Sequence, residues 1–385
     1  MFDLETVGYL TSEQGGAALA DIAALPLTDR VADISAVRAR YGLRAPALVE
    51  TTLLRRKAAA KLVDAGGWLF TDEALQQATA TAVAEHRAQR LSGRDVHDAT
   101  CSIGTELGAL RVTAASVVGS DLDPVRLKMA QHNLAGTVAV CRADALAPIT
   151  RDTVVIADPA RRSGGRRRFD PRDYTPALDD VLAVYRGRDL VVKCAPGIDF
   201  GALGALGFHG EIELTSLQGS VREACLWSGG LAHAGVARRA TLLDRGEQLT
   251  DAEPDDCGVG PAGRWIVDPD GAVVRAGLVR HYAARHGLWQ LDPDIAYLSG
   301  DQLPPGVRGF EVLDQLAFSE KRLRQALLGF DVGVLEILVR GVDVDPDALR
   351  RRLKLTGTQG CSVVITRIGT GSAARACAFV CRASR

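Results

Sequence analysis

The stretch "HDATCSIGTELGAL", from His97 to Leu110, decides the fold of this chain. A short run ending in Asp98 has the character of a β-strand, small residues follow as far as Gly104, and a helical pattern comes next. This layout lets the backbone approach a nucleotide closely and places a helix N-terminus at the switch point of an open sheet. Alone it is weak evidence, because any strand-to-helix turn of a parallel sheet can be rich in glycine.

Short apolar runs alternate with helical patterns from about residue 95 onward. The first five recur at the intervals of βαβ units, which predicts a parallel sheet with helices on both faces. The last two are close together and predict an antiparallel edge hairpin. We therefore expect an α/β fold with a seven-stranded Rossmann-like sheet, built from "DVHDAT" (95–100), "ASVVGSD" (115–121), "VAVCRAD" (138–144), "DTVVIAD" (152–158), "DLVVKCAP" (189–196), "EIELTS" (211–216) and "EACLWSGG" (223–230).

Three further regions flank this sheet. The N-terminal region is rich in Ala and Leu at helical spacing, and Thr79 and Thr81 are expected to divide its last segment into two helices. Turn signals after the sheet predict a connector with a few short strands and one helix. The C-terminal pattern predicts a compact ferredoxin-like β-α-β-α-β-β domain. The expected boundaries are 1–90 for the helical region, 91–230 for the sheet domain, 231–305 for the connector and 306–385 for the last domain.

Composition limits the class of protein. The 385 residues carry a formal charge of −1 with 47% hydrophobic and 24% charged residues, which indicates a soluble globular protein and excludes a globally basic nucleic-acid binder. The eight cysteines show no C-x-x-C spacing, so we expect free thiols, no disulfide framework and no zinc site. His86, His97 and His132 lack metal-like spacing and are expected to face solvent. Because no signal peptide or membrane-spanning run is present, we expect a cytoplasmic protein.

Acidic residues stand at the ends of four successive expected strands. Asp98 ends the first strand and Asp121 the second, where an acid can accept both hydroxyls of a ribose. Asp144 follows the third strand and can accept a hydrogen bond from an adenine amino group, and Asp158 follows the fourth. Helix capping is the alternative for Asp121 and Asp123, of which Asp123 is the better cap and Asp121 the better ribose ligand. Capping alone does not explain the whole set.

This pattern resembles the class I S-adenosylmethionine-dependent methyltransferases over about residues 95–230. Asp98 to Gly104 is similar to their first motif, and Asp158-Pro159-Ala160-Arg161 is similar to their catalytic-loop motif. One departure is Ser102, which stands where many relatives have glycine and narrows the space beside the methionine moiety. The resemblance implies S-adenosylmethionine as cofactor, held by Thr79, Asp98, Cys101, Gly104, Asp121, Leu122, Asp144 and Ala145.

Segments before and after the expected sheet resemble more specific groups of methyltransferases. "TATAVAEHRA" (79–88) is similar to the helix that precedes the fold in trimethylguanosine synthases. "LEILVRGVDVDPDALRRRLKL" (335–355), leading into "SVVITRIG" (362–369), looks like the THUMP-like domain attached to a group of bacterial methyltransferases. THUMP domains belong to RNA-modifying enzymes that act mainly on tRNA, so the resemblance implies RNA as the partner, with tRNA favoured.

Five arginines crowd into the eight residues Arg161 to Arg168, directly after the fourth expected strand. In methyltransferases of this fold, the loop at this place lies beside the methyl group. Asp158 and Pro159 are therefore expected to orient the attacking nitrogen, with Arg161 close to the reaction centre. Guanidinium groups bind phosphate in bidentate fashion and aromatic rings stack on bases, although a solvated charged loop is the alternative. The expected substrate contacts are Arg162, Arg166, Arg167, Arg168, Phe169 and Tyr174.

Two features of the sequence allow more than one interpretation of which atom receives the methyl group. Enzymes that methylate an exocyclic base nitrogen usually carry an aromatic residue after Asp-Pro-Pro, whereas this chain has Ala160 and Arg161. Either another residue stacks on the base, or Arg161 does, or the target is not an exocyclic amine. Cys194 stands roughly where RNA cytosine-C5 methyltransferases hold a nucleophilic cysteine, but its neighbours do not repeat their Thr-Cys-Ser pattern. We therefore favour the interpretation that Cys194 is a small buried residue that fills the end of its strand.

Two charged segments outside these motifs have open roles. Glu223 lies near the mouth of the expected sheet, where it can touch substrate or simply be solvated. The basic residues of 350–354 offer a further RNA contact, which local acids partly offset.

The sequence thus predicts methyl transfer from S-adenosylmethionine to a nucleobase of structured RNA, most readily a base nitrogen of tRNA. Two alternatives stay open. One is a small-molecule methyltransferase whose arginines bind a phosphorylated metabolite. The other is a non-catalytic RNA-binding protein with a vestigial cofactor fold.

Overall fold

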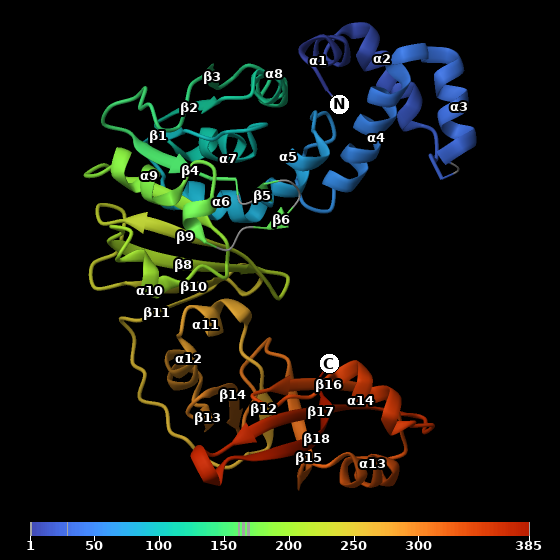
Figure 1. The fold of residues 1–385 in the computed structure, drawn as a ribbon, viewed down its shortest axis with the longest axis vertical. Coiled ribbons are helices and arrows are strands. Elements are labelled where there is room, and N and C mark those ends of the chain that lie inside the picture. The colour runs from blue at the N-terminus through green and yellow to red at the C-terminus, as the bar shows by residue number, and fades with distance from the viewer. Residues whose placement is uncertain (1, 29, 161, 164–165, 168–169, 385) are drawn as a thin grey trace. The chain divides into compact units, whose positions relative to one another are not determined.

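The computed structural model describes residues 2–28, 30–160, 162–163, 166–167 and 170–384 (Figure 1). The chain divides into two compact units. The first consists of Met1–Glu211 and Glu223–His233, and the second of Ile212–Arg222 and Ala234–Arg385.

All seven expected strands are present, and two more extend their sheet. In the described residues the sheet has nine strands in the order β11-β10-β8-β9-β7-β4-β1-β2-β3. The two additional strands, β10 and β11, arise in the segment that the sequence assigned to a connector, so the hairpin expected at the sheet edge lies inside the sheet. The strands are β1 (Asp95–Asp98), β2 (Ser116–Asp121), β3 (Ala139–Arg142), β4 (Val154–Ala157), β7 (Leu190–Cys194), β8 (Gly210–Leu217), β9 (Ser220–Ser228), β10 (Arg238–Leu242) and β11 (Glu247–Thr250).

Strand direction creates the crevice that holds the candidate site. β1 pairs in parallel with both β2 and β4, and β3 and β7 continue the parallel pairing outward on the two sides. From β1 the chain continues outward through β2 to β3 on one side of the sheet, and then through β4 to β7 on the other side. The order of the strands therefore reverses between β1 and β4. In open α/β sheets, ligands bind beyond the carboxyl ends of the strands at such a point. The helices of this region are α6 (Thr81–Arg90), α7 (Thr105–Thr113), α8 (Pro124–Asn133), α9 (Leu178–Val184) and α10 (Phe200–Leu203).

The N-terminal helices form an apolar cluster of their own. Its buried side chains include Leu19, Leu48 and Phe70, and Met129 of α8 belongs to the same cluster. The break expected at Thr79 and Thr81 is confirmed, because Ala78 and Ala80 leave the helical conformation between two helices. The helices are α1 (Leu4–Leu10), α2 (Glu13–Ala23), α3 (Arg30–Tyr41), α4 (Ala45–Ala58) and α5 (Asp72–Gln77).

The C-terminal part has the expected β-α-β-α-β-β order, and three preceding strands enlarge its sheet. Its strand order is β13-β14-β12-β15-β18-β17-β16. The expected single connector helix is two helices in the structure, because Gly277 with φ +70° ends the first. The elements are β12 (Trp265–Val267), α11 (Gly271–Arg275), α12 (Val279–His286), β13 (Trp289–Asp292), β14 (Ile295–Gly300), β15 (Gly309–Ala317), α13 (Glu320–Gly329), β16 (Val332–Arg340), α14 (Pro346–Leu353), β17 (Gln359–Ile368) and β18 (Arg375–Ala383).

None of the helices that the structure describes combines the length and the apolar character needed to cross a membrane.

Candidate active site

A cavity lies at the carboxyl ends of β1, β2 and β4, with residues of α5 on its wall. The predicted cofactor residues converge on it from four separate segments of the chain. Gly104 is not among the lining residues; it caps α7 with φ +89°, a conformation that favours glycine. The predicted residues that line the cavity are Thr79, Asp98, Cys101, Asp121, Leu122, Asp144, Ala145 and Asp158.

Backbone hydrogen bonds fix the loop between β1 and α7. The N–H of Ser102 donates to Asp121 Oδ2 at 2.9 Å, and the N–H of Asp123 donates to Asp121 Oδ1 at 2.9 Å. On the other side, the hydroxyl of Thr100 lies 2.7 Å from the backbone nitrogen of Asp158, which donates to it. The loop is thus tied to the ends of both β2 and β4. Asp123 also caps α8, as expected.

Asp98 lies buried at the floor of the cavity, with 2% of its surface exposed. Burial, reinforced by the negative charge of Glu106, raises the pKa of Asp98 to about 7. The N–H of Thr100 donates to Asp98 Oδ1 at 3.1 Å and partly opposes this rise. The Asp98 carboxyl can therefore change its charge near neutral pH.

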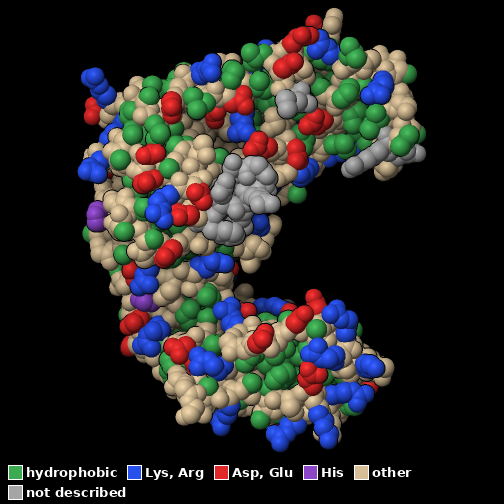
Figure 2. Space-filling model, in the orientation of Figure 1, with side chains coloured by type: hydrophobic (Ala, Val, Ile, Leu, Met, Phe, Trp, Pro, Cys, Tyr) green, Lys and Arg blue, Asp and Glu red, His purple; other side chains and the backbone are tan. Residues whose placement is uncertain are grey.

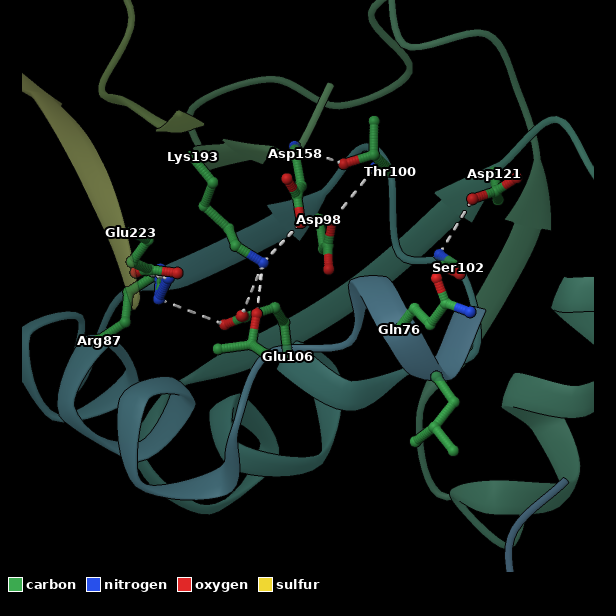
Figure 3. Close-up of polar contacts among 12 residues, drawn as sticks. Gln76, Arg87, Asp98, Thr100, Ser102, Glu106, Asp121, Asp158, Lys193 and Glu223 are labelled. Atoms are coloured by element: carbon green, nitrogen blue, oxygen red, sulfur yellow. Dashed lines mark hydrogen bonds and ion pairs between the residues drawn. The ribbon is translucent and has the colours of Figure 1, made fainter. Parts of the chain in front are cut away.

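Five side chains of alternating charge form a row beside Asp98, which we call the charge ladder (Figure 3). All of them except Asp158 are buried. Lys193 Nζ lies 2.6 Å from Asp158 Oδ2 and 3.2 Å from Glu106 Oε1. Arg87 Nη1 lies 3.8 Å from Glu106 Oε2, and Arg87 also forms an ion pair with Glu223. In order, the ladder is Glu223, Arg87, Glu106, Lys193 and Asp158.

Mutual pairing keeps Glu106 and Lys193 charged despite their burial. Burial opposes the ionised form of Glu106, but the charges of Arg87 and Lys193 outweigh it and lower the pKa of Glu106 to about 2. Burial likewise opposes the cationic form of Lys193, and the charges of Asp158 and Glu106 raise its pKa in spite of it. Glu223 differs, since burial outweighs the effect of Arg87 and raises its pKa.

The cavity fits a cationic nucleoside cofactor. Glu106 lines it, is 4% exposed, and within the described residues its Oε2 has no hydrogen-bond partner. The Arg87 guanidinium lies 3.8 Å from this oxygen, so Glu106 adds an acidic group to the cavity wall without lacking a counter-charge. Asp121 and Asp144 add two acidic groups at the ends of adjacent strands. S-adenosylmethionine carries both a cationic sulfonium and an adenosine, which these residues match.

The arginine run follows β4 as a short ribbon. Its backbone forms β5 (Arg162–Ser163) and β6 (Arg166–Arg167), with Arg162 opposite Arg167. Arg161, Arg168 and Phe169 lie outside the described residues. Pro159 is buried beside Asp158, and Ala160 exchanges two backbone hydrogen bonds with Thr175.

Tyr174 does not meet the expectation of a base-stacking residue in this conformation. It is 3% exposed, and its hydroxyl accepts a hydrogen bond of 3.4 Å from the N–H of Ala195. A ring enclosed in this way offers no free face to a ligand.

Three other expectations concern single residues. Cys194 is fully buried and is not among the cavity-lining residues, in agreement with a strand-end filler. Glu223 is not a solvated acid, because it is 6% exposed and paired with Arg87. The expectation for His97 is wrong: it is 1% exposed, lies 2.9 Å from the Ser120 hydroxyl through Nε2, and burial lowers its pKa to about 4.

The sequence did not identify most of the charge ladder. Arg87 is one of several polar residues on α6, and Glu106 has the position of an ordinary first-turn acid. The one available signal was Lys193 inside "LVVKC", because a lysine in an otherwise apolar buried strand requires a charged partner.

Comparison with known proteins gives three similarities. A profile of the THUMP domain-like family matches residues 307–383. The uncharacterised S-adenosylmethionine-dependent methyltransferases of Mycobacterium tuberculosis strains CDC 1551 and H37Rv are 68% identical over 358 residues, 91% of this chain and 100% of each relative. A structure assigned to a methyltransferase of Porphyromonas gingivalis W83 covers 100% of both chains with a TM-score of 0.77 at 18% identity, which shows a shared fold. The chain therefore belongs to the S-adenosylmethionine-dependent methyltransferases, with S-adenosylmethionine as its cofactor and a THUMP-like domain at its C-terminus.

Proposed function

We propose that this enzyme methylates a nucleobase of structured RNA in the cytoplasm, with tRNA as the favoured substrate and a base nitrogen as the target. The single observation that carries the proposal is the position of Asp158. It lines the same cavity as the predicted cofactor acids and immediately precedes the arginine run. We expect a substrate that reaches Asp158 to meet that positive charge, because the run begins three residues after Asp158 in the sequence.

In this proposal the role of each residue follows from its position in the cavity. Asp121 accepts hydrogen bonds from the ribose, Asp144 faces the adenine, and Thr79, Cys101, Leu122 and Ala145 shape the walls. Asp98 and Glu106 stabilise positive charge. When bound, S-adenosylmethionine supplies an electrophilic methyl group, so the protein contributes mainly proximity and alignment. Asp158 accepts the hydrogen of the attacking nitrogen, and Pro159 stiffens the loop that holds it.

Charge in the THUMP-like domain supports RNA as the partner. Residues 307–383 carry twelve Lys and Arg against eight Asp and Glu, and Figure 2 shows Lys and Arg side chains spread over this domain. Arg350 and Arg352 form ion pairs with Asp347 and Glu320. In the described part of the chain, the exposed cations without an ion pair on α13 and α14 include Lys321, Arg322, Arg351 and Lys354, the last at the C-cap. Free cations of this kind suit phosphate contacts.

The test is methyl incorporation from labelled S-adenosylmethionine into total RNA of a strain that lacks the gene, followed by nucleoside mass spectrometry. A methylated nucleobase that is missing in the deletion strain and restored by the enzyme is the expected result. Incorporation into phosphorylated metabolites alone would favour the small-molecule alternative. Retention of RNA without methylation by a protein that binds the cofactor would favour the non-catalytic alternative.

A further inference from the structure

The charge ladder ends at the residue that faces the acceptor. The side chains of Arg87, Lys193, Glu106 and Glu223 are 2–8% exposed, whereas that of Asp158 is 24% exposed. Glu106, Lys193 and Asp158 line the cavity, and Asp158 is the most exposed of the three. Burying paired charges is often no more stabilising than packing apolar side chains of similar volume. Stability alone therefore gives no reason for a row of charges that leads from β9 to the loop after β4.

Lys193 uses its donors on the protein itself. An ammonium group has three hydrogens to donate. Lys193 Nζ donates to Thr79 Oγ1 and Glu106 Oε1 and pairs with Asp158 Oδ2. These three oxygens come from three different segments and match the three hydrogens. Because its neighbours keep it cationic, Lys193 cannot accept a proton from a substrate, and its ion pair with Asp158 is the described contact through which it reaches the proposed proton acceptor.

We propose that Lys193 is a positioning residue, which holds Oδ2 of Asp158 through the charge ladder and so presents Oδ1 to the methyl acceptor. This inference rests on the proposed role of Asp158 in the methylation of RNA. A carboxylate held in one orientation favours an acceptor atom that carries a hydrogen. The substrate class is therefore an exocyclic amine, a ring N–H or a hydroxyl, rather than a ring nitrogen without a hydrogen.

The transfer step balances with these groups. The acceptor atom forms a bond to the methyl carbon while the carbon–sulfur bond breaks, and the electron pair of that bond stays on sulfur. The hydrogen of the acceptor leaves as a proton to Asp158 and passes from there to water. Lys193 keeps its protons throughout.

The experiment compares Lys193→Met and Lys193→Arg with a buried ion-pair control. The control is Glu211→Gln, because Glu211 is fully buried, pairs with Arg90 at 2.7 Å and is not among the cavity-lining residues. We expect Lys193→Met to lower kcat roughly 100-fold or more, as the loss of an aligned proton acceptor does. The KM for S-adenosylmethionine should change far less, Lys193→Arg should recover part of kcat, and Glu211→Gln should lower only the Tm.

A crystal structure of Lys193→Met with S-adenosylhomocysteine provides a readout that needs no RNA substrate. We expect the Asp158 carboxylate to turn away from its wild-type orientation. An unchanged Asp158, or a kcat equal to that of Glu211→Gln, would overturn the inference. If wild-type enzyme methylates no RNA, the proposed function fails while the crystal structure still tests the positioning role. Should Lys193→Met not fold, Lys193→Gln replaces it, since an amide is uncharged but still donates hydrogen bonds.

Discussion

Asp121 Oδ2 accepts a hydrogen bond of 2.9 Å from the backbone N–H of Ser102, so the carboxyl end of β2 is tied to the loop before α7. Ser102 has φ +49°, a left-handed conformation that is uncommon for a residue other than glycine. The hydrogen bond to Asp121 helps to hold it there. Asp121 therefore shapes the loop before α7, in addition to the ribose contact that we propose for its carboxylate.

Replacing Asp121 by Ala should weaken the binding of S-adenosylmethionine by roughly 100-fold or more. Two charge-assisted hydrogen bonds to the ribose are lost, each contributing about 1.5–3 kcal/mol. Isothermal titration calorimetry measures the change. Asp123→Ala is the matched control: it removes the N-cap of α8, which lowers stability by about 1 kcal/mol, but Asp123 does not line the cavity. Equal affinities of Asp121→Ala and wild type would place the ribose elsewhere.

Replacing Asp158 by Ala should abolish most turnover and leave cofactor affinity close to that of wild type. In the proposed mechanism this residue faces the attacking group and not the adenosine, and loss of a positioned proton acceptor costs roughly 100-fold to 10,000-fold in rate. Single-turnover methylation and calorimetry separate the two effects. Asp170→Ala serves as control, since Asp170 is an acid of the same loop that pairs only with exposed Arg172 among the contacts described. Full activity of Asp158→Ala would exclude the proposed role.

Cys194→Ser should retain most of the methyltransferase activity. Side chains alternate along a strand, so Lys193 reaches the cavity while the fully buried Cys194 points to the other face of β7. A thiol placed there cannot attack a pyrimidine ring. Activity assays and denaturing gels of enzyme incubated with RNA check this. Loss of activity together with a covalent RNA adduct would replace the present mechanism by pyrimidine-C5 methylation.

The strands were predictable from sequence because local apolar runs define them, and the four acids at their ends follow from the parallel topology. The sequence predicted short strands in the connector without assigning them to a sheet, and the short, polar "EQLT" becomes β11 of the first sheet only by pairing with β10. The charge ladder depends on pairings between distant residues, such as Arg87 with Glu223, which no local spacing encodes. His97 was misjudged for the same reason, since its partners Ser120 and Thr150 belong to other segments.

The stability of the ligand-free protein should carry a pH dependence that comes from Asp98. Its pKa of about 7 in the folded state lies above the unfolded value near 4, so between these values only the folded state holds the proton. The contribution of Asp98 to the free energy of unfolding is therefore most favourable below about pH 4 and is lost as the pH rises to 7. Urea unfolding of wild type and Asp98→Asn from pH 5 to 8 measures this as a difference between two curves.

Wild type and Asp98→Asn share His97, so the difference between their curves removes the contribution of His97. The lowered pKa of His97 has the opposite effect and reduces the free energy of unfolding as the pH falls from about 6.5 to 4. We expect Asp98→Asn to gain stability relative to wild type as the pH rises. A difference that stays constant across the range would show that Asp98 does not titrate there.

The arginine run should govern how RNA affinity depends on salt. Each phosphate contact to single-stranded RNA contributes a slope of about −0.7 in log K against log salt concentration. Replacing Arg166, Arg167 and Arg168 by Ala should flatten the slope by about two units if all three contact phosphates. S-adenosylmethionine binding should be unchanged, because we expect this run to face the substrate and not the cofactor. Arg161, which follows Asp158 by three residues in the sequence, should differ and affect turnover as well as affinity.

Filter binding at several salt concentrations measures these slopes beside wild type. Arg38→Ala with Arg40→Ala on α3 is the control, because it removes positive charge from an exposed helix away from the cavity-lining residues. If the triple variant has the slope of wild type, the run is a solvated loop. The binding of RNA must then depend on the free cations of α13 and α14, and Arg351→Ala with Lys354→Ala should flatten the slope instead.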